Sequence, residues 1–295
     1  FSAFAAGVSL SVFIYWGWDV VLTMTEETKG SAATPGKAAA LTILVIVVIY
    51  QLMAVSLINF AGTSSGDFGL GNPDIQENIF AALSGPVMGP VAILMSIAVL
   101  GSSAASLQST VIGPARTMLA MGYYGALPKR FAQITPRFQS PGFATIVSAG
   151  VSFVFYAIMR VISEAVLWDT ITALGMMVCF YYGITAFACV WYFRHNAFDS
   201  ISHAINRCIA PAIGGTLLLV FFFQTSIDAM DPSYGSGSSL FGVGLVFLLG
   251  AAVLISGVIA MGLTWWKCPE FFRNETLTRR KPEDPLISVD TSFDP

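Results

Sequence analysis

The sequence predicts an all-α integral membrane protein, and three observations support this class. Apolar residues make up 55% of the 295 residues and charged residues only 11%, whereas soluble domains carry roughly 25% charged residues. Seven windows are long and apolar enough to form membrane-crossing helices, each of which needs about 20 residues. Lys and Arg fall almost entirely in alternate connections between these windows. A multi-pass membrane protein is therefore expected.

The first three predicted spans differ in their polar content. The first, residues 3–25, contains a carboxylate and a glycine between aromatic residues. The second, residues 38–61, is mainly aliphatic. The third, residues 86–112, becomes polar towards its end and is expected to continue as one helix to about residue 122. The Gly-rich connection before it contains DIQENIFAALSG, which predicts a short amphipathic helix on the outer surface.

The last four predicted spans are more uniformly apolar. A charged, Gly/Pro-rich connection precedes the span at residues 142–161, and short connections separate it from the spans at 168–193, 209–227 and 240–265. Residues 266–295 combine charge, Pro and Ser/Thr, which is typical of a disordered tail.

The distribution of positive charge predicts the orientation of these spans. Thirteen of the 14 Lys and Arg residues follow the first, third, fifth and seventh spans, and only Arg160 lies on the other side. Because cytoplasmic loops carry an excess of Lys and Arg, the first span is expected to run from outside to inside and the tail to be cytoplasmic. The chain starts with Phe1 rather than Met and has an odd number of spans. We therefore expect an N-terminal part to be missing.

The ionisable residues argue against several classes of protein. Asp19 is the only carboxylate well inside a span, and neither His195 nor His203 lies inside one. A membrane hydrolase would need a buried acid–base or metal cluster, and no span contains a Lys for a retinal Schiff base. The four cysteines form no CxxC pair and are expected to be small buried hydrophobic residues. No enzyme, metal site or nucleic-acid partner is expected.

Gly17 lies among large aromatic residues in the first span, in the sequence FIYWGWD. A glycine inside a helix costs about 1 kcal/mol relative to alanine. One interpretation is close helix packing through small residues. The other is a broken helix, as in transporters whose interrupted spans bind substrate near mid-membrane. Aromatic rings beside such a break would cover a bound solute and attract an ammonium group by cation–π interaction.

Two further segments have polar or aromatic residues inside spans. The third span contains LGSSAASLQST, whose hydroxyls would either bond to carbonyls four residues earlier or supply oxygens to a cation in a wet cavity. The fifth contains CFYYGITAF, in which Tyr181 and Tyr182 beside Gly183 would either line the same cavity or pack within the protein.

Two motifs together resemble the amino acid/polyamine/organocation (APC) permeases. FIYWGWDVVLTMTEETKGSAATPGKA is similar to the sixth transmembrane segment of that family and the loop after it. GPARTMLAMGYYGALPKRFAQITPRFQSPGFATI resembles the segment after the eighth helix, with matches at Arg116, Gly125, Leu127 and Pro128. Ala115 replaces the usual Ser, and Tyr123–Tyr124 replace an Arg-Asp pair. The resemblance covers residues 1 to about 265.

The resemblance implies a particular fold and partner. The seven spans would correspond to helices six to twelve of a LeuT-like five-plus-five inverted repeat. They would form its second repeat and two extra helices, with the N-terminal half of the same protein as the missing partner. By this resemblance, the protein is expected to be a multi-pass plasma-membrane transporter that moves amino acids or related amines by alternating access. A non-transporting amino-acid sensor on the same fold is the alternative.

The resemblance also implies site residues. In this family the sixth helix unwinds at the position of Gly17, and backbone carbonyls there would receive the substrate ammonium. Trp18 would close over the bound solute. The substrate-binding segment is Phe13, Ile14, Tyr15, Trp16, Gly17 and Trp18, and the expected carbonyl ligands are those of Phe13, Ile14 and Trp16.

The resemblance also implies residues that would couple transport to an ion. Asp19 would sense protons, and Ser102 and Ser103 match hydroxyls that hold a sodium ion in related transporters. Coupling to protons, sodium or solute exchange is expected, without another cofactor. The charges expected at the cytoplasmic gate or in bracing its loop are Glu26, Glu27 and Arg116, although a solvated surface is the alternative for the two glutamates.

Overall fold

The computed structural model describes residues 1–25, 28, 34–76, 78–162, 164–195, 200–273 and 275–276. In these ranges six helical segments are long and apolar enough to cross a membrane. The corresponding elements are α3 (Thr34–Ala61), α6 (Ile93–Tyr123), α7 (Gly142–Ile162), α8 (Glu164–Phe193), α10 (Ala210–Asp228) with the short elements before it, and α11 (Leu245–Lys267). The all-helical membrane class predicted from the sequence is confirmed.

The first predicted span is not one continuous helix. It consists of α1 (Ser2–Ile14), a non-helical segment at residues 15–19, and α2 (Val20–Thr23). The interruption coincides with Gly17, which has a φ angle of 104°. Residues 26 and 27, which hold two of the expected gate charges, lie outside the described residues.

The third helix begins later than the sequence predicts. Residues 86–91 belong instead to the end of α5 (Ile79–Met88) and to the 3-10 turn η2 (Gly89–Val91), after the short α4 (Pro73–Gln76). Gly89 has a φ of 54° and is followed by Pro90. Both residues interrupt a helix, because positive φ favours glycine and proline lacks a backbone donor. From Ile93 the helix is continuous to Tyr123, close to the expected end at residue 122.

The last two spans also have different bounds from those predicted. A short helix, α9 (Ile201–Ala204), and a π-helical turn, η4 (Ile205–Ile209), extend the sixth span at its start. Before α11 the chain forms a small hairpin of β1 (Ser239–Leu240) and β2 (Val243–Gly244), in which Ser239 pairs with Gly244. The 3-10 turn η3 (Lys129–Ala132) precedes α7, and α12 (Pro269–Phe272) follows α11. Most of the predicted tail lies outside the described residues.

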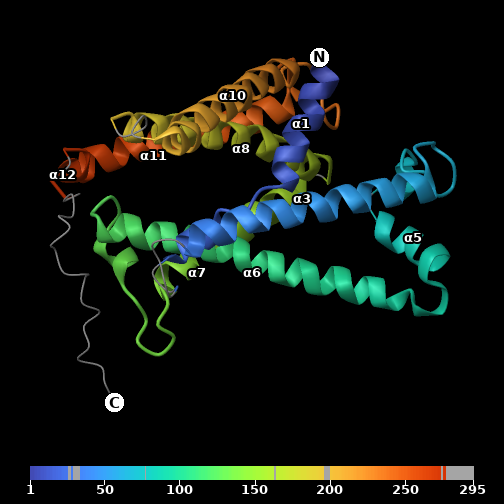
Figure 1. Ribbon diagram of the computed structural model, residues 1–295, viewed down its shortest axis with the longest axis horizontal. Coiled ribbons are helices and arrows are strands. Elements are labelled where there is room, and N and C mark those ends of the chain that lie inside the picture. The colour runs from blue at the N-terminus through green and yellow to red at the C-terminus, as the bar shows by residue number, and fades with distance from the viewer. Residues whose placement is uncertain are drawn as a thin grey trace.

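The helices form two groups, which Figure 1 shows as an upper and a lower layer. Helix α8 contacts α1, α10 and α11 in the first group. It also contacts α7, which packs against α6 in the second group. Helices α3 and α6 diverge towards α5 in Figure 1, and the most apolar window of each contains no buried residue. The packed core therefore surrounds α8, whereas α3 and α6 present mainly open surfaces.

Small residues allow the helices to approach α8 closely. A Cβ atom on Gly175 would lie 2.8 Å from the carbonyl oxygen of Ser9 in α1. A Cβ atom on Gly183 would lie 2.8 Å from a methyl carbon of Leu219 in α10. Such small residues are typical of helix interfaces in membranes because packing there depends on close backbone approach.

A buried carboxylate attaches the loop between α10 and α11 to α8. Asp169 is only 1% exposed and accepts hydrogen bonds from the backbone N–H and the hydroxyl of Ser236, at 2.8 and 2.6 Å. These bonds satisfy both carboxylate oxygens. Asp169 therefore has a structural role at the end of α8 that is predicted to face outward.

Candidate functional site

The candidate site is centred on the interruption between α1 and α2. The helical hydrogen-bond pattern ends at Ile14 and begins again at Val20. Gly17 between them adopts a positive φ, which side-chain-bearing residues rarely adopt. The glycine and its aromatic neighbours thus form the break that one of the two interpretations of FIYWGWD predicts.

The break leaves backbone acceptors available. Within the described part of the chain, no hydrogen-bond donor reaches the carbonyl oxygen of Ile14 or of Trp16. The carbonyl of Phe13 differs, because it accepts a hydrogen bond of 3.1 Å from the N–H of Trp16. Of the three carbonyls expected to receive an ammonium group, Ile14 and Trp16 are therefore available and Phe13 is already engaged.

Two tyrosines of α8 hold the carboxylate of Asp19. Tyr181 donates from its hydroxyl to Oδ2 of Asp19 at 3.0 Å, and Tyr182 donates to Oδ1 at 3.1 Å. The indole N–H of Trp16 donates to the Tyr181 hydroxyl oxygen at 2.9 Å. These bonds connect both sides of the break to one turn of α8.

Aromatic rings surround this hydrogen-bond network. The rings of Trp18 and Tyr182 stack with centroids 5.7 Å apart and an interplanar angle of 26°. Tyr15 packs against Tyr50 of α3 at 5.3 Å, whereas the Trp16 side remains 41% exposed. Aromatic rings therefore lie on several sides of the break, and those of Trp16 and Tyr50 remain accessible.

Asp19 has hydrogen-bond donors but no counter-charge among the described residues. It is half-buried, and both of its carboxylate oxygens contact neutral tyrosine hydroxyls. No Lys or Arg in the described ranges forms an ion pair with it. A carboxylate inside a membrane protein normally meets a cation, a proton or a wet cavity. The arrangement suits a site that receives positive charge.

The structure does not connect Ser102 and Ser103 to this network. Both lie on α6 and are exposed, and no hydrogen bond in the described residues links them to Asp19 or the tyrosines. The hydroxyls that follow them bond within their own helix, such as Thr110 to the carbonyl of Ser106 at 2.8 Å. The sodium assignment remains a prediction. No group of three or more potential metal ligands occurs in the described residues.

Arg116 lies towards the end of α6, on the side of α2. It is half-buried and lines a cavity of about 270 Å³ together with Met24, Gln139 and Thr145. It therefore lies near the end of the broken span that is expected to be cytoplasmic. Its predicted partners in the gate, Glu26 and Glu27, lie outside the described residues.

Three tyrosines complete the site. The sequence left open whether Tyr181 and Tyr182 line a cavity or pack within the protein, and it did not indicate Tyr50. The YYG sequence of the fifth span was itself a signal, because it repeats the pairing of aromatic residues with glycine seen at the break. Tyr50 lies in an aliphatic helix with no such motif, and only its ring contact with Tyr15 identifies it.

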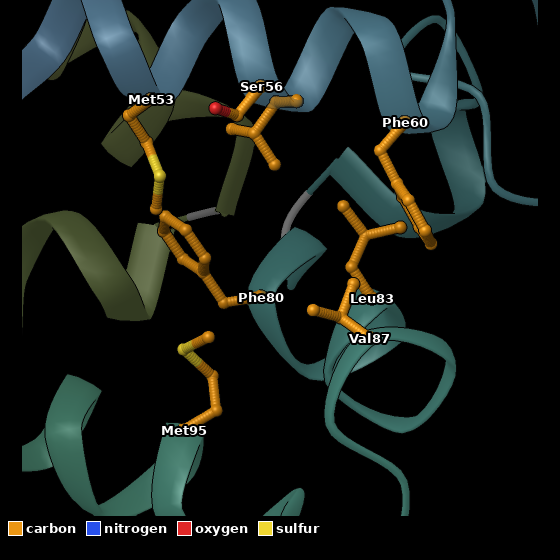
Figure 2. Close-up of a pocket in the computed structure, with 8 residues that line it drawn as sticks. Met53, Ser56, Phe60, Phe80, Leu83, Val87 and Met95 are labelled. Carbon is orange, nitrogen blue, oxygen red and sulfur yellow. The ribbon is translucent and has the colours of Figure 1, made fainter.

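A second cavity lies apart from the break, between α3, α5 and α6. Its volume is about 360 Å³, and Figure 2 shows Met53, Phe80 and Met95 pointing towards one another across it. Its lining is almost entirely apolar, and its one hydroxyl, that of Ser56, bonds to the carbonyl of Leu52. It lacks the convergent polar groups of a substrate site.

Together, the fold and this geometry define a multi-pass helical membrane protein in which one span is interrupted at Gly17. The family model described as amino acid permease matches residues 1–249. The chain therefore belongs to the amino acid permease family. This membership confirms the class predicted from the two sequence motifs, a membrane permease rather than an enzyme.

Individual relatives are also named as transporters. The chain is 27% identical over 177 residues to a vacuolar protein of Arabidopsis thaliana named cationic amino acid transporter 4, covering 59% of this chain and 28% of the relative. It is 26% identical over 247 residues to uncharacterized transporters of Mycobacterium bovis and Mycobacterium tuberculosis, covering 82% of this chain and 49% of each relative. The chain thus spans half or less of the length of these relatives. No solved structure matches it.

Proposed function

We propose that this chain is the C-terminal part, equivalent to helices six to twelve, of a secondary transporter that moves an amino acid or related amine by alternating access. The observation that carries this proposal is the interruption at Gly17, where free carbonyls lie beside a carboxylate and several aromatic rings. Interrupted spans with these features bind substrates and ions in transporters. The family membership supports the same function.

In this proposal the ammonium group of the substrate binds the carbonyl oxygens of Ile14 and Trp16. No donor within the described residues reaches these acceptors, so a charged donor would gain a strong interaction there. Trp18 closes over the solute from its stacked position on Tyr182. Cation–π attraction from these rings adds to the binding of an ammonium group.

Asp19 provides the proposed coupling to protons. Its carboxylate lies two residues from Gly17, so a change in its protonation would act directly on the break. Exchange of solutes is the other mode that this arrangement allows. Sodium coupling would use the exposed hydroxyls of Ser102 and Ser103 on α6 together with further oxygen ligands.

An N-terminal half would complete the transporter. The open surfaces of α3 and α6 are the proposed contacts with this half and with lipid. Unsatisfied backbone groups facing lipid cost several kcal/mol each, so the broken span needs a protein or water-filled surrounding. The plasma membrane is the proposed location, and the vacuolar relative makes an internal membrane the alternative to test by fluorescence microscopy of a tagged protein.

Uptake by the purified full-length protein in proteoliposomes tests this function. Radiolabelled L-lysine, L-leucine, L-glutamate and putrescine serve as probes, with and without an imposed pH gradient. We expect saturable uptake of at least one probe, which an excess of the same unlabelled compound prevents. Saturable binding without uptake would instead identify a sensor, and the absence of both with the natural amino acids would contradict the proposal.

A further inference from the structure

The hydrogen bonds between Trp16, Tyr181 and Asp19 have a fixed direction. An indole N–H can only donate, so the Tyr181 oxygen accepts from Nε1 of Trp16 at 2.9 Å. The Tyr181 hydroxyl proton then points to Oδ2 of Asp19 at 3.0 Å. The three side chains therefore form a chain of donors that ends on the carboxylate.

This chain of hydrogen bonds crosses the helix break without following the backbone. Trp16 precedes Gly17 and Asp19 follows it, while Tyr181 belongs to α8. The Trp16 side chain is 41% exposed, and its other ring contact is Phe13 at a centroid distance of 6.2 Å. The bond to Tyr181 is therefore the directional contact that orients the Trp16 ring.

We propose that Tyr181 is a positioning residue that makes the orientation of the Trp16 ring depend on the charge of Asp19. This inference rests on the proposed transport function, in which Asp19 gains and loses a proton. A hydrogen bond to an ionised carboxylate is roughly twice as strong as one to a neutral group. Because bonds in a chain polarise one another, neutralising Asp19 weakens the hold of Tyr181 on Trp16.

The proton that neutralises Asp19 binds at Oδ1. Tyr182 lies at that oxygen, at 3.1 Å, and no indole N–H holds it as Trp16 holds Tyr181, so its hydroxyl can turn from donor to acceptor. Tyr181 cannot turn in this way without losing Trp16. A hydronium ion from solvent supplies this proton: one O–H bond forms at Oδ1, one O–H bond of the hydronium ion breaks, and a water molecule is left.

The other titratable or charged groups around the break are few in the described ranges. Tyr181 and Tyr182 face Asp19 from α8, Tyr50 of α3 packs on Tyr15, and Arg116 of α6 lies beside Met24, which follows α2. On α10 the carboxylate is Asp228, which bonds to Ser2 at the opposite end of α1. Among these groups only the two tyrosines bond to Asp19, and only Tyr181 also bonds to Trp16.

Fluorine NMR of the full-length protein labelled with 5-fluorotryptophan tests the inference. The resonance that disappears in Trp16→Phe is assigned to Trp16 and followed from acidic to alkaline pH. We expect it to move with pH in the wild type and to stay constant in Asp19→Asn and in Tyr181→Phe. The matched control is Tyr182→Phe, which also removes one bond to Asp19 but leaves Trp16 held, so its Trp16 resonance should still move.

Two results would overturn the inference. One is a Trp16 resonance that titrates as strongly in Tyr181→Phe as in the wild type. The other is a resonance that is constant in the wild type or in Tyr182→Phe. Unchanged positions of the fluorotryptophan resonances other than those of Trp16 and of Trp18, which stacks on Tyr182, show that each variant is folded. Uptake measured on the same preparations separates the two proposals, since the expected NMR pattern without any uptake would remove the transport function alone.

Discussion

Asp19 is the residue of the broken helix that forms hydrogen bonds to both tyrosines of α8. Both of its oxygens accept tyrosine hydroxyls, and no cation among the described residues neutralises it. Hydrogen bonds to a charged group each stabilise by about 1.5–3 kcal/mol. A proton or a substrate cation that binds Asp19 would therefore change both of these hydrogen bonds.

Replacing Asp19 by Asn tests its proposed role in coupling. The amide retains the size of the carboxyl group but cannot ionise. We expect uptake by the full-length protein to fall at least about tenfold, which corresponds to about 1.4 kcal/mol, and the remaining uptake to be independent of pH. Initial rates measured over a range of pH check this.

The matched control for Asp19 is Asp67→Asn, which changes an exposed carboxylate in the loop between α3 and α4. It should retain the pH dependence of the wild type. Uptake that varies with pH in Asp19→Asn as it does in the wild type would show that another group couples transport to protons.

Single residues illustrate what the sequence could and could not predict. Gly17 and Asp19 stood out because a glycine among aromatic rings and a lone carboxylate are unusual inside a span. The partners of Asp19 could not be predicted, because Tyr181 is 162 residues away and its contacts depend on the rotation of α8. Likewise, only the turn geometry shows that the carbonyl of Phe13 is already engaged.

Helix α8 organises the packed part of the molecule at the scale of elements. It positions the two tyrosines against the break and contacts α1, α10 and α11 along its length. Its glycines allow these contacts, and the break itself depends on one more glycine in the neighbouring span. Two pairs of substitutions separate these contributions.

Gly17→Ala should destabilise the break. No atom lies within 4 Å of the added Cβ, so the effect comes from the φ of 104° alone. A left-handed conformation costs a residue with a side chain about 1–2 kcal/mol. Thermal unfolding and uptake should both show a loss.

Gly7→Ala is the matched control for the change at Gly17. Gly7 lies within α1, and no atom is within 4 Å of its added Cβ either. Here alanine should stabilise the helix by up to about 1 kcal/mol. Equal effects of the two substitutions on stability would argue against backbone strain at Gly17.

Gly215→Ala should disturb the contact between α8 and α10. The added Cβ would lie 2.9 Å from the Cβ of Ala186 and 3.2 Å from the carbonyl oxygen of Gly183. Overpacking of this kind costs about 1–3 kcal/mol, so the thermal unfolding temperature should fall.

Gly214→Ala is the matched control for Gly215→Ala. Gly214 lies in the same helix, and its added Cβ meets no atom within 4 Å. Gly214→Ala should therefore unfold at or above the temperature of the wild type. If both variants unfold together, the close approach of α10 to α8 does not stabilise the protein.

The whole molecule has a packed side around α8 and an open side formed by α3 and α6, as Figure 1 shows. Composition and apolar windows predicted the helical membrane class, because they depend on local sequence alone. They did not predict the start of α6, where Gly89 and Pro90 override hydrophobicity. They also gave no information on which helices would pack tightly, since apolar residues contact both lipid and protein.

The predicted orientation of the whole chain is testable by cysteine labelling. Phe241 is 95% exposed at the turn between β1 and β2, on the side expected to face outward. In intact cells a membrane-impermeant maleimide should label Phe241→Cys but not the wild type, whose Cys268 lies on the expected cytoplasmic side. In permeabilised cells Cys268 should also react. Labelling of the wild type in intact cells would contradict the predicted orientation.

The most direct test of the central claim is amino-acid uptake by full-length protein carrying Trp18→Ala. Trp18 stacks on Tyr182 beside the break, so its loss should reduce uptake at least about tenfold with normal expression. Trp266→Ala, at an 80% exposed position near the end of α11, should transport as the wild type does. Normal uptake by Trp18→Ala would contradict the assignment of the substrate site to the broken helix.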